Sequence, residues 1–118
     1  MAKSGSTWVD PGRPALRAPL RAVGPVFIRG PLAEVLIAVI RARHPDAQVI
    51  DRGAYLRVEV PGRCHLVRAE VEARLGRVLA LPADLEEVMP SFKGALAITD
   101  DEVIWQVGPA GQLEEGTP

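Results

Sequence analysis

The sequence predicts an α+β fold of two successive β-α-β-β-type units, in which antiparallel sheets pack against helices. Several short runs alternate between apolar and polar residues, which is the pattern of a half-buried strand. Residues 30–45 and 68–76 instead repeat apolar residues every three or four positions, which is typical of amphipathic helices. Short turns rich in Gly and Pro separate the strands, so antiparallel pairing is expected.

Composition limits the class of protein. The 118 residues, 47% hydrophobic and 25% charged, suit one soluble globular domain. A net charge of -1 disfavours a protein whose main role is to neutralise phosphates. The longest wholly apolar run, residues 35–40, is far shorter than the about 20 residues that a membrane-spanning helix needs. Residues 1–22 lack the apolar core of a secretory signal and a single cysteine excludes an internal disulfide, so we expect a cytoplasmic protein.

A folded domain is predicted over residues 23–107, between two flexible tails. Residues 1–22 are rich in Pro, Gly and Arg, and three of the prolines interrupt any helix or strand: Pro11, Pro14 and Pro19. Residues 108–118 form a second tail, which is short and acidic.

The first unit begins with a strand at residues 25–29 and continues into a helix. Gly30 and Pro31 occupy the cap and first-turn positions of this helix, and Pro45 ends it. Its apolar residues keep the spacing of one buried face: Leu32, Val35, Leu36, Val39 and Ile40.

A hairpin completes the first unit, with strands near residues 48–51 and 54–60. Arg52 and Gly53 form the turn, because glycine adopts a positive φ without steric cost. The second strand turns one set of residues to the core: Leu56, Val58 and Val60. The opposite, solvated side carries Tyr55, Arg57 and Glu59.

The second unit is predicted to start with a strand at residues 64–67 and a short helix at residues 68–76. One or two further helical turns follow at residues 81–90. The last two strands, at residues 91–99 and 102–107, are joined by a turn of two aspartates.

No catalytic, cofactor-binding or metal-binding residue is predicted. Cys64 and His65 are neighbours in a strand, so their side chains point to opposite faces and do not share one ion. We interpret His65 and His44 as ordinary surface or helix-end residues, and Cys64 as a small buried side chain. The chain contains neither a Gly-x-Ser-x-Gly motif nor a phosphate-binding loop, so it is not expected to be an enzyme.

An alternative hypothesis is a ferredoxin-like binding module for RNA or a small ligand. The β-α-β-β order is found in RNA-binding sheets, which stack bases on aromatic side chains. Here aromatic residues are few, with two Trp, one Tyr and two Phe in the whole chain. Only the shared face of Tyr55 and Arg57 supports this alternative.

Three stretches resemble, in order and spacing, the effector (coupling or regulatory) proteins of bacterial soluble di-iron monooxygenases. These stretches are "VGPVFIRG…AEVLIAVI", "VIDRGAYLRVEVPGRCHLVRAEVEARLGR" and "DLEEVMPSFKGALAITDDEVIW". The resemblance extends over residues 23–107, and "DRGAY", "LGR" and "SFKG" are its strongest parts. Relatives act in methane, phenol, toluene and alkene systems, and "DRGAYLRV" is nearer the toluene and alkene branch.

This resemblance implies the monooxygenase regulatory protein fold and a role without cofactor. Such effectors bind the multisubunit di-iron hydroxylase, reshape its active site, and couple electron transfer and O2 activation to hydroxylation or epoxidation of a hydrocarbon, here aromatic or alkene. A reductase, and in toluene-type systems a Rieske ferredoxin, deliver the electrons and are only indirect partners. We expect the free chain to be a monomer that binds neither nucleic acid nor membrane.

The resemblance also places one hydroxylase-facing stretch, on Met89, Pro90, Ser91, Phe92 and Lys93. In methane-type relatives this stretch is small and rich in hydroxyl groups, whereas here it is bulkier, so the same gating behaviour is not carried over. Phe92 equally suits the first core residue of its strand, and Met89 equally suits a filler of the core.

The hairpin supplies a second group of candidate partner-binding residues: Arg52, Tyr55 and Arg57. Tyrosine and arginine are enriched at the energetic centres of protein interfaces. A solvated strand face, with one aromatic ring packed on its neighbours, is the alternative interpretation of the same residues.

Overall fold

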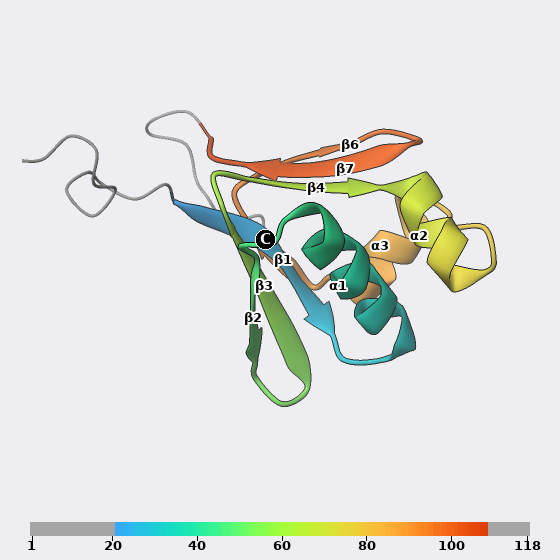
Figure 1. The fold of residues 1–118 in the computed structure, drawn as a ribbon, viewed down its shortest axis with the longest axis horizontal. Coiled ribbons are helices and arrows are strands. Elements are labelled where there is room, and N and C mark those ends of the chain that lie inside the picture. Colours follow the sequence, from blue (N-terminus) through green and yellow to red (C-terminus); the bar gives the residue numbers. More distant parts are fainter. Residues whose placement is uncertain (1–20, 109–118) are drawn as a thin grey trace, which may run out of the picture.

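The computed structural model describes residues 21–108 (Figure 1). The predicted tails, residues 1–22 and 108–118, lie almost entirely outside the described residues. The elements follow the order β-α-β-β-β-α-α-β-β-β, which contains the two predicted units in sequence. Within residues 21–108, no helix is both long enough and apolar enough to cross a lipid bilayer.

The first sheet has four strands in the order β2-β3-β1-β5. Its members are β2 (Gln48–Asp51), β3 (Tyr55–Pro61), β1 (Ala22–Ile28) and β5 (Ser91–Lys93). All neighbours in this sheet are antiparallel. The chain therefore returns from the second unit to place β5 beside β1 of the first unit.

The second sheet has three antiparallel strands in the order β4-β7-β6. They are β4 (Arg63–Val67), β7 (Glu102–Gln106) and β6 (Ala95–Ile98). β6 and β7 form a hairpin around the predicted turn of two aspartates. β4 follows β3 directly in the chain and belongs to this second sheet.

Two glycines form the corners at which the chain passes from one sheet to the other. Gly62 lies between β3 and β4 with φ of 77°, and Gly94 lies between β5 and β6 with φ of 107°. A Cβ atom on Gly94 would lie 2.8 Å from the carbonyl oxygen of Gln106 and 2.9 Å from Cγ1 of Val23. Our prediction of one strand over residues 91–99 is therefore wrong: Gly94 divides it into two strands that belong to different sheets.

The first strand begins earlier than predicted, at Ala22 instead of residue 25. Gly24 and Pro25 disfavour a strand by local propensity. Pairing overrides that propensity, because Val23 faces Val60 of β3 while Gly24 and Pro25 face residues of β5. The strand is held on both sides, so a weak local sequence is sufficient.

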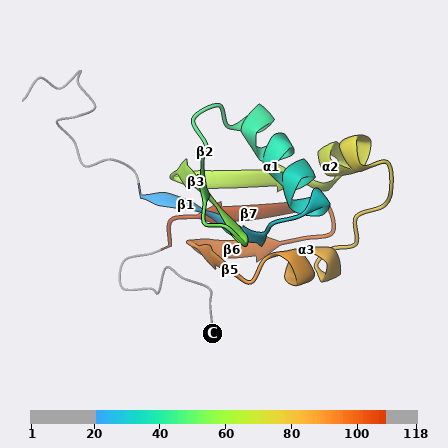
Figure 2. The same ribbon diagram turned by 90° about the horizontal axis from the view of Figure 1, so that it is seen from below.

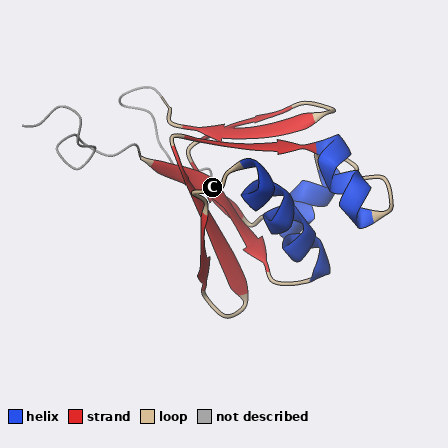
Figure 3. Cartoon of the chain, in the orientation of Figure 1, coloured by secondary structure: helices blue, strands red, loops and turns tan. Residues whose placement is uncertain are grey.

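Three helices lie on the inner side of the two sheets and gather at one end of the molecule (Figures 1 and 3). They are α1 (Pro31–Arg43), α2 (Arg68–Leu75) and α3 (Ala83–Val88). Helix α1 packs against α2 and β4. Viewed from below, α1 and α2 lie on one side and α3 on the other, next to the start of β5 (Figure 2).

The core lies between the sheets and α1, and Trp105 on β7 is its largest fully buried side chain. The predicted inward residues of the hairpin are buried: Leu56, Val58 and Val60. Helix α1 buries Ala33, Leu36, Ile37, Val39 and Ile40. Leu32 and Val35, which we expected on that face, are only partly buried at its margin.

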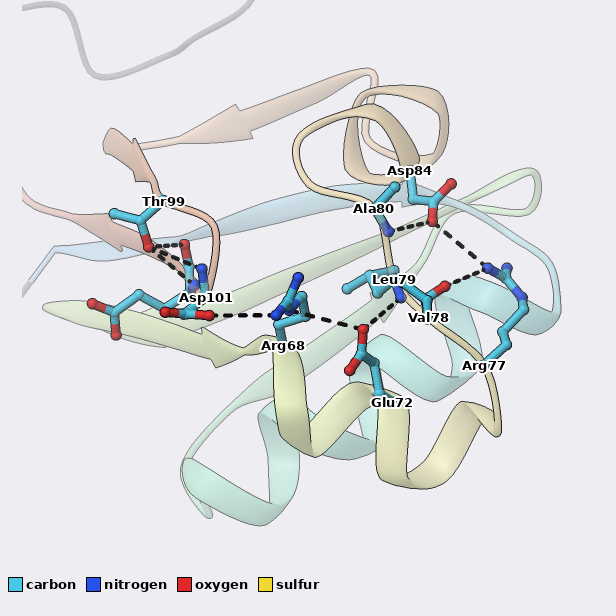
Figure 4. Close-up of polar contacts among 10 residues, drawn as sticks. Arg68, Glu72, Arg77, Val78, Leu79, Ala80, Asp84, Thr99 and Asp101 are labelled. Atoms are coloured by element: carbon cyan, nitrogen blue, oxygen red, sulfur yellow. Dashed lines mark hydrogen bonds and ion pairs between the residues drawn. The ribbon is translucent and has the colours of Figure 1, made fainter.

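The connection between α2 and α3 is fixed by side-chain hydrogen bonds (Figure 4). The Glu72 carboxylate accepts a hydrogen bond of 2.8 Å from the backbone N–H of Leu79. The Asp84 carboxylate accepts one of 2.9 Å from the backbone N–H of Ala80. Leu79 is thereby held in the core at 1% exposure, whereas the adjacent Val78 is 71% exposed at the surface.

Candidate partner-binding surface

Four of the predicted partner-binding residues lie on the side of the first sheet that faces away from the helices: Tyr55, Arg57, Ser91 and Lys93. Val26 of β1 is the register partner of Arg57 on β3 and also of Ser91 on β5. Cross-strand partners in an antiparallel sheet point to the same face. The hairpin residues and the stretch around Ser91 are far apart in sequence, and β1 joins them into one surface.

We name this surface the outer sheet face and define it by the outward residues of its strands: Gly24, Val26, Ile28, Ile50, Tyr55, Arg57, Glu59, Ser91 and Lys93. Two of these residues, Ile28 and Tyr55, are register partners and remain 43% and 46% exposed. Val26 and Ile50 are half-buried beside them. These four apolar residues form a strip across the sheet, which we call the apolar strip. Charged residues lie at other positions of the same strands.

A groove of about 190 Å³ opens on the outer sheet face. Its lining comes from three strands: Gly24, Val26, Arg57, Val58, Glu59, Ser91, Phe92 and Lys93. Gly24 has φ of 146°, and a Cβ atom there would lie only 2.3 Å from the carbonyl oxygen of Val58. Only glycine fits this close approach of β1 to β3, so the sheet carries no side chain at the point where the groove lies.

Charged groups surround the groove unevenly. The guanidinium of Arg57 lies 3.6 Å from the carboxylate of Glu59, and both side chains are partly exposed. The side chain of Lys93 makes no hydrogen bond or ion pair in the part of the chain that the structure describes. The groove therefore has two cations and one carboxylate along its lining.

The end of the β2–β3 hairpin is held in place by a polar network. Arg29 forms an ion pair with Asp51 and donates a hydrogen bond of 2.7 Å from Nε to the carbonyl oxygen of Gly53. Asp51 also accepts a hydrogen bond of 2.8 Å from the backbone N–H of Gly53. The hydrogen bonds from Arg29 and Gly53 lower the pKa of Asp51. This network fixes the position of Arg52, whose own backbone N–H donates to the carbonyl oxygen of Tyr55 at 2.8 Å.

The predicted stretch around Ser91 is divided between surface and core. Pro90 is exposed, while Ser91, Phe92 and Lys93 are half-buried on β5. Phe92 packs partly against the core. Met89 is 9% exposed and belongs to the core, as our alternative interpretation of this residue held.

Sequence reasoning did not identify Ile28 or Gly24 as members of the surface. The signal for Ile28 is the alternation along β1, in which Phe27 is buried and Val26 and Ile28 face outward. For Gly24, the signal is a glycine within a strand, which often marks a close backbone approach.

Two kinds of reactive site come into consideration among the described residues: a metal-binding cluster and an activated thiol. In residues 21–108, no group of three or more His, Cys, Asp or Glu side chains could hold a metal ion. Burial raises the pKa of the Cys64 thiol to about 12, so this group is not a nucleophile at neutral pH. An apolar strip with charged neighbours is instead suited to contact with a protein surface.

Comparison with known proteins gives three findings. A protein-family model described as the MmoB/DmpM family matches residues 21–106. The effector subunit of the alkene monooxygenase system of Xanthobacter autotrophicus (strain ATCC BAA-1158 / Py2) is 41% identical over 85 residues, which are 70% of this chain and 83% of that protein. Two solved structures, described as a phenol hydroxylase–regulatory protein complex, contain chains with a similar fold.

The first of these structural matches has a TM-score of 0.68 at 23% identity and covers 75% of this chain and 100% of the other. The second has a TM-score of 0.64 at 21% identity and covers 73% and 99% of the two chains. The predicted fold class, α+β with antiparallel sheets packed against helices, is confirmed by this likeness.

Proposed function

Since the chain belongs to the MmoB/DmpM family of monooxygenase effector proteins, we propose that it binds the di-iron hydroxylase of a multicomponent monooxygenase through its outer sheet face. Members of this family are non-catalytic components, so the activity resides in the partner. Because the chain belongs to this family of effector proteins, we do not propose the alternative, a module that binds RNA or a small ligand.

One observation supports the location of the docking surface. Val26 pairs with both Arg57 and Ser91, so the outward residues of the hairpin strand β3 and of β5 form one continuous surface. Exposed Ile28 and Tyr55 add apolar area to it. We propose that Met89 contributes indirectly, because its buried side chain positions Pro90 and Ser91.

The proposed action on the hydroxylase is a shift between conformations. A protein that contributes no reactive group changes a partner's reactivity only if it binds one of the partner's conformations more tightly than another. A coupling free energy of about 1–3 kcal/mol changes such an equilibrium roughly 5- to 150-fold. The effector would thus reshape the active site and couple electron transfer and O2 activation to oxidation of the hydrocarbon.

The proposed system oxidises an alkene or an aromatic hydrocarbon. The 41% identical relative is the effector subunit of an alkene monooxygenase system, which supports epoxidation of an alkene as the first reaction to test. A reductase and a Rieske ferredoxin would supply electrons to the hydroxylase without a lasting contact to this chain. We further propose that the free protein is a cytoplasmic monomer.

The test is product formation by the cognate hydroxylase and its electron-transfer partners, measured with and without this chain. We expect addition of the chain to increase both the rate and the ratio of product formed to NADH consumed. The purified chain alone should form no product. Absence of stimulation at every effector concentration, together with absence of a complex with the hydroxylase, would overturn the proposal.

A further inference from the structure

We propose that the groove beside Gly24 receives one acidic side chain, Asp or Glu, from the hydroxylase and holds its carboxylate between Arg57 and Lys93. This inference rests on the proposed function, and it adds the chemistry of the partner at one point of the interface.

The register places the two cations on opposite sides of β1. Gly24 faces Lys93 on β5, and Val26 faces Arg57 on β3. Neighbouring strands lie about 4.8 Å apart and each residue advances about 3.4 Å along a strand, so the backbones at Arg57 and Lys93 are roughly 12 Å apart diagonally across β1. Long side chains from both strands can therefore reach one group lying over Gly24, where no side chain of this protein fills the space.

The lining of the groove carries a net positive charge, which a bound anion would balance. Its charged lining residues are Arg57, Lys93 and Glu59, so two positive groups and one negative group leave a net charge of +1. In the part of the chain that the structure describes, the Glu59 carboxylate pairs only with Arg57, at 3.6 Å, and the Lys93 side chain makes no ion pair or hydrogen bond. An incoming carboxylate would pair with Lys93 and share the guanidinium of Arg57, whose several N–H donors can serve two acceptors.

The surroundings favour a single carboxylate over a larger anion. The groove measures about 190 Å³ and contains two cations, too few for a polyanion, and the whole chain has a net charge of -1. The Ser91 hydroxyl can donate a further hydrogen bond from the groove wall. Val26, Ile28 and Tyr55 of the apolar strip would exclude water once the partner docks, which strengthens the charge interaction.

The experiment measures the affinity of the full-length chain for the cognate hydroxylase at low and high salt, by fluorescence anisotropy of labelled effector. Lys93→Met and Arg57→Met keep much of the side-chain length and remove the charge. We expect each to weaken binding at least tenfold at low salt and to reduce its salt dependence. Lys93→Arg should restore affinity to within about threefold, because it retains the charge. Unchanged thermal unfolding of each variant shows that its fold is intact.

Arg74→Met is the matched control. Arg74 is exposed on α2, at the helical end of the molecule, and its replacement makes the same change in charge. Its affinity should stay within about twofold of the parent chain. A loss equal to that of Lys93→Met would show a general effect of net charge and would overturn the inference.

The outcomes separate this inference from the proposed function. If Lys93→Met and Arg57→Met bind like the parent chain while Tyr55→Ala binds more weakly, the groove takes no carboxylate but the docking surface stands. If the parent chain does not bind the hydroxylase, both proposals fail. Restoration of Lys93→Glu binding by an Asp→Lys or Glu→Lys change in the hydroxylase would identify the acidic residue.

Discussion

Ile28 on β1 and Tyr55 on β3 are direct partners across the strand pair, and both side chains remain substantially exposed. Their backbones are anchored by the sheet, and the adjacent hairpin turn is held by the Arg29–Asp51 ion pair. Apolar side chains that are already fixed in position lose little conformational entropy when a partner binds. This pair is therefore the expected energetic centre of the outer sheet face.

Replacement of either residue by alanine should weaken binding to the hydroxylase without unfolding the protein. We expect Tyr55→Ala and Ile28→Ala each to raise the dissociation constant about tenfold or more, since interface hot spots contribute about 2 kcal/mol. Val78→Ala is the control, because Val78 is more exposed and lies in the α2–α3 connection. The dissociation constants are measured by isothermal titration calorimetry. If all three variants bind the hydroxylase as tightly as the parent chain does, the Ile28–Tyr55 pair is not part of the interface.

The corner at Gly94 should tolerate no side chain. Gly94→Ala would combine a positive φ with contacts of 2.8 Å to the Gln106 carbonyl oxygen and 2.9 Å to Val23. We expect a loss of roughly 2–5 kcal/mol in the free energy of unfolding, measured by chemical denaturation. Gly30→Ala is the control, because a Cβ atom there meets nothing within 4 Å. The Gly30→Ala change should lower the free energy of unfolding by less than about 1 kcal/mol, which is the usual difference between helix-capping residues.

Stability should fall at mildly acidic pH because of His44. The backbone N–H of His65 donates a hydrogen bond of 2.9 Å to Nε2 of His44, which must be unprotonated to accept it. Desolvation is the largest influence and lowers the pKa of His44 below its ordinary value of 6.5; Arg43 lowers it further and Asp46 opposes this. The unfolded chain thus binds the proton more readily, so stability present above about pH 6.5 is lost as the pH falls through the lower folded-state pKa.

The measurement is the free energy of unfolding between about pH 7.5 and about pH 5, for the parent chain and for His44→Gln. Glutamine offers an acceptor oxygen that does not titrate in this range. The variant should lose less stability on acidification than the parent. Parallel pH profiles for the two proteins would show that His44 makes no contribution.

Cys64 should be inert in the folded protein. Its side chain is fully buried in β4, and burial raises the pKa of the thiol to about 12. We expect no reaction with a chromogenic disulfide reagent at about pH 8 under native conditions, and one thiol per chain after denaturation, since the sequence has a single cysteine. Rapid labelling of the native protein would contradict the described burial.

Local sequence patterns predicted where most helices and strands lie, but they did not predict the corner at which the chain passes between the two sheets. The turn at Arg52 and Gly53 and the alternation of the following strand are local signals, and β2 and β3 lie where they predict. The division of residues 91–99 at Gly94 depends instead on contacts with Val23 and Gln106, which no local pattern reveals.

The outer sheet face was only partly predictable for the same reason. Tyr55 and Arg57 stand out because polar and aromatic residues alternate with buried ones on one strand. Their proximity to Ser91 arises because β1 pairs on both of its edges, which is a property of the topology. Met89 shows the converse limit, since the predicted surface stretch begins with it, yet its side chain packs in the core beside Val88 while Pro90 is exposed and Ser91 half-buried.

Site-specific photocrosslinking shows whether the outer sheet face lies against the hydroxylase in the complex. A benzophenone amino acid would be placed at Ser91, on β5 of the outer sheet face, or at Val78, in the α2–α3 connection. We expect a covalent adduct with the hydroxylase from position 91 that excess unlabelled chain suppresses, and none from position 78. An adduct from position 78 with none from position 91 would contradict the proposed docking.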